Sequence, residues 1–151
     1  MHKCVFGIIF AALALPLALA AQTNNGFAGT WKLNVDKSKI ESGGGAKAET
    51  VTIAADGKVN VEEVTNDGQT VAWSYAAVPG QEVTITGMGD NATVIETRPD
   101  DRTIEHVWKI AGANEHGKGV LSDDGKVMIY TITGTNAKGE KVQSEEYFEK
   151  Q

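Results

Sequence analysis

From residue 22 onward, the sequence consists of short segments in which apolar and polar residues alternate, separated at fairly regular intervals by glycine-containing turns. Such alternation places successive side chains on opposite faces of a β-strand, and no apolar stripe follows the 3.6-residue period of a helix. The segments that fit are 28–34, 48–54, 58–65, 69–77, 82–86, 92–97, 102–110, 115–122, 126–133 and 140–149. They predict an all-β fold, an antiparallel up-and-down β-barrel of about 8 to 10 strands with no substantial helix.

Residues 1–21 have the features of a secretory signal peptide. They begin with a charged residue, continue as an apolar stretch over residues 5–19 and end in the small-residue cleavage site Ala18-Leu19-Ala20. A transmembrane helix is the alternative, but it needs about 20 apolar residues, and a proline interrupts this run. We therefore expect residues 22–151 to form a single domain that is exported, either periplasmic or secreted.

The only cysteine, Cys4, lies near the start of the leader and not at its end. We therefore expect the mature protein to have no lipid-anchor cysteine, no membrane anchor, no disulfide and no thiolate metal site. Loss of Lys3 with the leader makes the formal net charge of −6 one unit more negative. A negative balance of this kind argues against binding to nucleic acid or to anionic membrane surfaces.

The turns set the expected register of the hairpins. The turn that ends at Gly57 fits a two-residue loop, or a three-residue loop with the glycine in a left-handed conformation. The shorter loop would place Ile53 opposite Asn60, whereas the longer loop places Ile53 opposite Val59, so we expect the longer one. A one-residue error would turn every side chain of a strand to the other face of the sheet. The same loop here and at Gly68 and Gly125 predicts the pairs Val51–Val61, Val61–Trp73, Val59–Tyr75, Leu121–Val127 and Gly119–Ile129.

Two further connections complete the expected inner face. A four-residue loop over residues 136–139 pairs Ile129 with Glu146 and Val127 with Phe148. The hairpin around residues 111–114 adds the pairs Ile104–Leu121, His106–Gly119 and Trp108–Gly117. Large rings are expected to lie over these two bare glycines, although glycines that relieve strain where a barrel bends are an alternative.

The expected inner face is mostly apolar, with a few polar interruptions. Glu63 and Glu146 are costly to bury unless they are paired, hydrogen-bonded or wet, so their positions imply either a solvated cavity or a different register. His106 is either a hydrogen-bonded core histidine or a ligand-binding group. His116 faces the opposite surface of the wall, so the two histidines do not form one metal site. The expected cavity is lined by Trp73, Tyr75, His106, Trp108, Ile129 and Glu146.

Two segments at the ends of the domain have a distinctive pattern. Phe27-Ala28-Gly29-Thr30-Trp31-Lys32-Leu33 contains a glycine two residues before a strand tryptophan, and Tyr147-Phe148-Glu149-Lys150 closes the chain. The first resembles the G-x-W strand of the lipocalins and intracellular fatty-acid-binding proteins, both calycins, and the second is similar to their final strand. The resemblance implies a barrel whose first and last strands pair, with structural roles for Gly29, Trp31 and Phe148. The chain as a whole looks like a short exported lipocalin-like protein of bacteria.

The last strand departs from that resemblance. In fatty-acid-binding proteins it usually projects an arginine and, two residues later, a tyrosine, which hold the ligand's carboxylate. The matching positions here are Glu146 and Phe148, and a carboxylate would repel a fatty-acid headgroup. The helical lid of the group is not expected either, because only residues 34–47 separate the first two strands and residues 43–45 are glycines. At most one helical turn is expected, around residues 36–40.

Three functions remain open. There is no G-x-S-x-G, H-E-x-x-H or Walker motif, so we expect neither an enzyme nor a bound cofactor. The leading hypothesis is a non-enzymatic exported barrel that binds a small apolar molecule, neutral or cationic. The second is a filled barrel acting as an inhibitor or envelope interaction module, with Met128, Tyr130 and Ile132 as an exposed patch for a protein partner. The third is a haem or metal barrel that uses His106.

Overall fold

The computed structural model describes residues 25–42 and 45–151, so the predicted signal peptide and Cys4 lie outside the described residues. Within these ranges the only helix is a short 3₁₀ helix, Val35–Lys37, and none is long and apolar enough to span a membrane. The strands are β1 (Gly29–Leu33), β2 (Lys39–Ser42), β3 (Ala46–Ile53), β4 (Lys58–Thr65), β5 (Thr70–Ala76), β6 (Glu82–Thr84), β7 (Thr93–Asp100), β8 (Thr103–Ile110), β9 (Ala113–Leu121), β10 (Val127–Thr135) and β11 (Lys141–Lys150).

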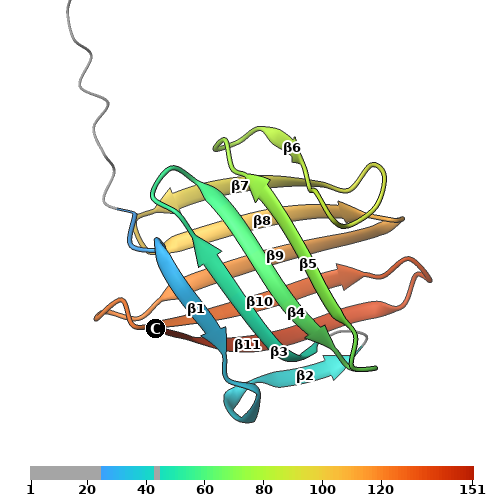
Figure 1. Cartoon of the computed structure of the whole chain (residues 1–151), viewed down its shortest axis with the longest axis horizontal. Coiled ribbons are helices and arrows are strands. Elements are labelled where there is room, and N and C mark those ends of the chain that lie inside the picture. Colours follow the sequence, from blue (N-terminus) through green and yellow to red (C-terminus); the bar gives the residue numbers. More distant parts are fainter. Residues whose placement is uncertain (1–24, 43–44) are drawn as a thin grey trace, which may run out of the picture.

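The strands form one antiparallel sheet that curves almost into a closed barrel (Figure 1). Most strands pair with their neighbours in sequence, β1 lies between β3 and β11, and the path runs β5-β4-β3-β1-β11-β10-β9-β8-β7-β6. The two ends of this path meet where the backbone N–H groups of Ser74 and Thr86 donate to each other's carbonyl oxygens, at 2.9 and 2.8 Å. The predicted all-β, up-and-down barrel and the pairing of its first and last strands are confirmed.

The connection between β1 and β3 is more ordered than the sequence suggests. The 3₁₀ helix begins after Asn34, whose side-chain oxygen accepts a hydrogen bond from the Lys37 N–H at 3.2 Å. The chain then forms β2, which was not predicted and which pairs with the middle of β11, with Ile40 opposite Ser144. Since β11 has ten residues and pairs with β1 only near its C-terminal end, β2 covers part of the edge that β1 leaves open.

The two N-terminal hairpins have the register that the turns predict. Ile53 lies opposite Val59 and Val51 opposite Val61, and the next strand places Trp73 opposite Val61. Each loop is closed by a backbone hydrogen bond across three residues, such as Ala54 N–H to the Lys58 carbonyl at 2.8 Å, with Gly57 at a positive φ of 88°. The sequence rule of the bulged three-residue loop therefore holds at both turns.

The predicted register of β10 is wrong by one residue. The loop after β9 has four residues and not three, because the Ser122 N–H donates to the Val127 carbonyl at 2.8 Å. The loop before β11 has three residues and not four, because the Asn136 N–H donates to the Glu140 carbonyl at 3.0 Å. The two errors cancel across β10, so β9 and β11 keep their expected faces and β10 alone is inverted. The observed pairs are Leu121–Met128, Gly119–Tyr130, Tyr130–Glu146 and Met128–Phe148.

This correction changes which residues of β10 face the interior. Met128 is 4% exposed, whereas Ile129, predicted to line the cavity, is 42% exposed on the outer face. Tyr130 and Ile132 also turn inward, so the apolar surface patch predicted from Met128, Tyr130 and Ile132 is not formed. Strand β8 is displaced as well, but by two residues relative to β9, with His106 opposite Gly117 and Trp108 opposite Glu115. An even displacement keeps each side chain on its predicted face.

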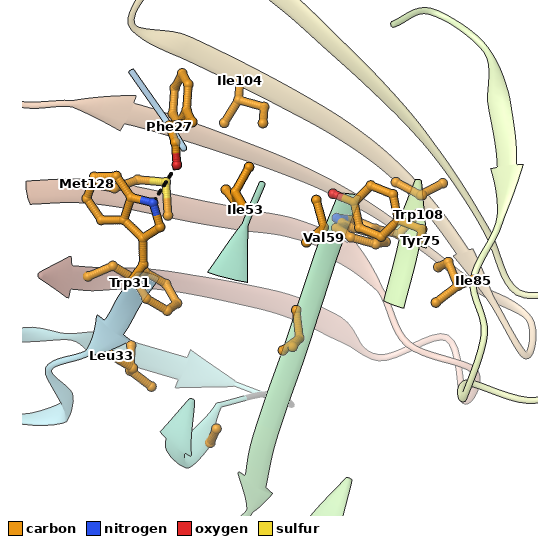
Figure 2. Packing of buried hydrophobic residues seen from close by; sticks show 14 of the residues in the cluster. Phe27, Trp31, Leu33, Ile53, Val59, Tyr75, Ile85, Ile104, Trp108 and Met128 are labelled. Atoms are coloured by element: carbon orange, nitrogen blue, oxygen red, sulfur yellow. Dashed lines mark hydrogen bonds between the residues drawn. The ribbon is translucent and has the colours of Figure 1, made fainter. Parts of the chain in front are cut away.

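One end of the barrel is closed by packed apolar side chains. Trp31 is fully buried, and its indole N–H donates to the Phe27 carbonyl oxygen at 2.7 Å. Figure 2 shows Phe27, Trp31 and Met128 together, apart from the group that contains Tyr75 and Trp108. Phe148, 2% exposed, joins this closed end from β11. Burying a ring of this size contributes roughly 2–3 kcal/mol.

The backbone geometry and the close packing at position 29 both favour a glycine. Its φ is 138°, a region that favours glycine, and an added Cβ would lie 2.6 Å from Cε of Lys150. The Lys150 side chain crosses this bare backbone, and its ammonium lies 5.1 Å from the ring centroid of Trp31. The glycine therefore lets the closing strand β11 approach β1.

Candidate functional site

A cavity of about 220 Å³ lies inside the barrel, on the far side of this closed end. It is larger than the roughly 150 Å³ cavity that can hold benzene, and smaller than the roughly 300–1,000 Å³ of most ligand pockets. Half-buried residues such as Glu63 and Ile110 line it at the ends of β4 and β8, which marks the mouth. The size suits a molecule about as large as one aromatic ring with a short chain.

Three aromatic rings form one wall of the cavity. Trp108 of β8 meets Trp73 of β5 edge to face, with ring centroids 5.5 Å apart and planes at 85°. It meets Tyr75 in the same way at 5.8 Å and 88°. Such contacts stabilise a pair by about 0.5–1.5 kcal/mol beyond area burial, so the wall is held in a defined shape. The Trp73 indole N–H is buried and has no hydrogen-bond partner within the described residues.

A chain of hydrogen bonds runs behind the aromatic wall, with His106 at its centre. The Trp108 N–H donates to the Tyr130 hydroxyl at 3.3 Å, and that hydroxyl lies 2.8 Å from Nδ1 of His106. On the other side, Nε2 lies 3.0 Å from the Tyr75 hydroxyl, which donates to Glu96 at 3.3 Å. If Tyr130 donates to Nδ1, the Nε2 position carries the proton, and every donor in the chain has an acceptor.

The chain ends on a buried carboxylate. Glu96 is 1% exposed, and one of its oxygens accepts from Nε of Arg98 and pairs with Nη2, both at 2.9 Å. Burial would raise the pKa of Glu96, but its hydrogen bonds with His106 and Arg98 and the positive charge of Arg98 outweigh it and hold the pKa below its usual value. Arg98 in turn donates to the side-chain oxygen of Asn25. We infer that Glu96 is ionised and fixes the orientation of His106.

The mouth of the cavity is acidic. Glu49 and Glu63 lie opposite each other on β3 and β4, and Glu115 and Glu146 line the same cavity. Burial, together with the charges of Glu146 and Glu63, raises the pKa of Glu49 to about 8. Burial also raises the pKa of Glu146 to about 7, against a hydrogen bond from Ser144 that lowers it. Like charges placed opposite each other destabilise a sheet, so this grouping is costly without a counter-charge.

The structure brings most of the predicted site residues together. Trp73, Tyr75, His106, Trp108 and Glu146 all line the one cavity, whereas Ile129 lies on the outer face. Neither ring nitrogen of His106 is free, since both contact protein groups. Among the residues that the structure describes, no group of three or more His, Cys, Asp or Glu side chains is placed to hold a metal ion.

Sequence reasoning missed three polar residues of the site. Tyr130 was assigned to the surface because of the inverted strand. Glu49 could have been found, since the confirmed register of β3 and β4 places it opposite Glu63. Glu96 alternates with the buried residue Val94 along β7, but the inner face of that strand was not assigned. The signal that could have identified Glu96 is its spacing from Arg98, because residues two positions apart lie on one face of a strand and an acid and a base placed so can pair.

Comparison with known proteins gives structural matches alone. No protein-family model matches the chain, and no curated protein matches it by sequence. A fatty-acid-binding protein of Schistosoma mansoni, solved in complex with arachidonic acid, is similar in structure with a TM-score of 0.54. The match covers 85% of this chain and 98% of that chain at 12% identity. The fold is that of the calycins.

A second similar structure is a protein of unknown function of the DUF3598 family from Nostoc punctiforme PCC 73102. Its TM-score is 0.56 at 14% identity, and the match covers 84% of this chain and 48% of that chain. This chain therefore spans about half the length of that larger protein. At such identities the two likenesses concern the calycin fold and do not identify a ligand.

Proposed function

We propose that the protein is an exported, non-enzymatic binding protein that holds a small apolar molecule inside its calycin barrel. The observation that carries the proposal is the cavity of about 220 Å³ with its wall of Trp73, Tyr75 and Trp108. The fold supports it, since the similar Schistosoma protein was solved with arachidonic acid. The cavity is small for a long acyl chain, and Glu146 lines it, so a short guest other than a fatty acid fits better.

Binding of small ring compounds to the domain of residues 22–151 tests the proposal. We expect 2-phenylethanol or a charged relative of it to give saturable heat in calorimetry and a change in tryptophan emission, because Trp73 and Trp108 line the cavity. The Val61→Phe variant narrows the cavity and should weaken binding at least tenfold. Asn60→Phe, the next residue on the outer face of β4, is the matched control and should bind like the wild type.

Should Val61→Phe fail to fold, Ile132→Phe at the half-buried rim serves in its place. The proposal would be overturned if neither 2-phenylethanol nor its charged relatives bound saturably. Binding that persists unchanged in a folded Val61→Phe or Ile132→Phe protein would place the binding site elsewhere and contradict it too.

Export has its own test. Expression of the full chain in a bacterial host, followed by fractionation, should yield periplasmic or secreted protein whose N-terminus is Ala21 or Gln22. Retention of the leader on a membrane-bound product would contradict this part of the proposal. The predicted alternative, a filled barrel that acts through an apolar surface patch, lacks the patch on which it was based. The outer face of β10 presents Ile129 beside Val120 in place of Met128, Tyr130 and Ile132.

A further inference from the structure

We propose that the molecule held in the cavity is a small amphipathic cation, with its ammonium group at the carboxylates of the mouth and its apolar part against the aromatic wall. This inference rests on the proposed function and specifies the chemical class of its ligand. It is carried by the lining of the cavity, in which four glutamates that lie close enough to interact with one another share the space with apolar and aromatic groups.

The charge of the lining is one-sided. Glu49, Glu63, Glu115 and Glu146 come from β3, β4, β9 and β11, and no Lys or Arg stands among the described residues that line the cavity. Several carboxylates elsewhere are paired with a cation, as with Glu82 and Lys109 at 2.8 Å or Glu149 and Lys37 at 2.8 Å. The described lining of the mouth thus has no counter-charge of the kind that these outer carboxylates have, and a cationic guest would supply one.

The aromatic wall and its unpaired donor point to a guest independently of the acidic groups. Rings of Trp73, Tyr75 and Trp108 line a space that continues to the glutamates, and aromatic faces attract ammonium groups by about 0.5–2 kcal/mol. The buried Trp73 N–H has no protein acceptor among the described residues. Leaving such a donor unpaired costs about 1–3 kcal/mol, and an acceptor atom on the apolar part of the guest, which the ammonium group itself does not supply, would recover it.

The size of the cavity limits the apolar part. A volume of about 220 Å³ holds a single ring or a short alkyl chain and leaves no room for a long acyl chain. An arylalkylamine or a short alkylammonium compound fits both this volume and the position of the carboxylates.

Release of protons from the carboxylates is a second expected consequence of binding a cation, and it can be measured separately from the affinity. A cation favours the ionised carboxylates, so its binding should displace protons from Glu49 and Glu146, whose pKa values lie at about 8 and about 7. Besides Glu63 and Glu115, Tyr130 of β10 interacts with both carboxylates, and Glu96 of β7 acts in turn on Tyr130. Affinity for a cation should therefore rise from pH 6 to pH 8.5, while affinity for a neutral guest stays level.

Three compounds that differ in one group form the test: 2-phenylethylamine, 2-phenylethanol and 3-phenylpropanoate, titrated calorimetrically into the domain at pH 8. We expect the amine to bind at least tenfold more tightly than the alcohol and the carboxylate to bind weakest. Calorimetry in buffers of different ionisation heat should show protons released with the amine alone. Failure of all three to bind would refute the proposed function itself.

If the alcohol binds saturably and as tightly as the amine or more tightly, the proposed function stands and this inference is overturned.

Two variants test whether the carboxylates of the mouth cause the preference for the amine. Glu63→Gln should weaken the amine about threefold to tenfold and leave the alcohol unchanged, because it removes one charge from the mouth. Glu62→Gln removes the same charge from the outer face of β4 and should change neither affinity. Equal effects of the two variants would show that net charge, and not the mouth, governs binding.

Discussion

Gly117 of β9 leaves room for the side chain of Tyr130 on the neighbouring strand. A Cβ at this position would lie 1.8 Å from the Tyr130 hydroxyl oxygen and 2.5 Å from Cζ. Gly117→Ala should therefore displace the ring, break its hydrogen bond to His106 and lower the free energy of unfolding by about 1–3 kcal/mol. Urea denaturation followed by tryptophan emission measures the loss.

The control for this prediction is a double-mutant cycle with Tyr130→Val. Removal of the ring takes away the three atoms nearest to the added methyl group, so Gly117→Ala should cost much less in the Tyr130→Val background. An equal cost in both backgrounds would show that the effect comes from the backbone of β9. Gly117 has no left-handed φ, which makes the cycle a test of space alone. The sequence indicated a ring over this glycine, but only the register decides which ring.

Arg98 is the second residue whose role the structure defines. Its substitution by Met would leave the carboxylate of Glu96 buried without its charged partner, which costs about 3–5 kcal/mol. The pKa of Glu96 should then rise, because the charge and hydrogen bond of Arg98 that lower it would be lost, so the loss of stability should be smaller at pH 4.5 than at pH 8. Lys109→Met, which breaks an exposed pair with Glu82, is the control. It should cost much less than Arg98→Met at either pH, because both partners are exposed to solvent. Similar losses in the two variants would contradict this role of Arg98.

At the scale of elements, β10 shows where prediction from the sequence succeeds and fails. The loops at Gly57 and Gly68 could be assigned because one register pairs apolar residues and the other does not. β10 is apolar on both faces, with Val127 and Ile129 on one and Met128 and Tyr130 on the other, so hydrophobic pattern gives no preference. Its register is fixed by the lengths of two loops, which the sequence does not distinguish by one residue. A register error of one residue leaves the predicted fold class correct, but it changes which residues are predicted to line the cavity.

A pair of adjacent substitutions on β10 tests the observed register. Ile129→Lys places a charge on the outer face, where the side chain is already 42% exposed, and should change the free energy of unfolding by less than about 0.5 kcal/mol. Met128→Lys places the same charge at the closed end, where Met128 is 4% exposed, and should prevent folding or cost about 4 kcal/mol or more. Thermal unfolding by circular dichroism distinguishes the two. The reverse order of stability would restore the register predicted from the loops.

At the scale of the whole molecule, the barrel combines one apolar end with one acidic end. The closed end, built on Trp31 and Phe148, follows from the sequence pattern of the first and last strands. The acidic mouth follows only in part, because Glu49 and Glu63 share one hairpin but meet Glu115 and Glu146 only through the tilt and closure of the sheet. Stability should therefore depend on pH in a way that the composition alone does not suggest.

The direction of that dependence follows from the two kinds of buried carboxylate. Glu49 keeps its proton in the folded state up to about pH 8, whereas the unfolded chain releases it near 4.5, so the free energy of unfolding should fall between these pH values. Glu96 has a lowered pKa and acts oppositely, with its contribution lost as the pH falls below the unfolded value near 4.5. The melting temperature should thus be highest near pH 5.

The Glu49→Gln variant should flatten the alkaline decline of the melting temperature. It should melt a few degrees above the wild type at pH 8, with no gain at pH 5. Glu62→Gln on the outer face should follow the wild-type profile. Differential scanning calorimetry from pH 4 to pH 9 measures all three proteins, and a wild-type melting temperature that rises from pH 5 to pH 8 would contradict the burial of uncompensated carboxylates at the mouth.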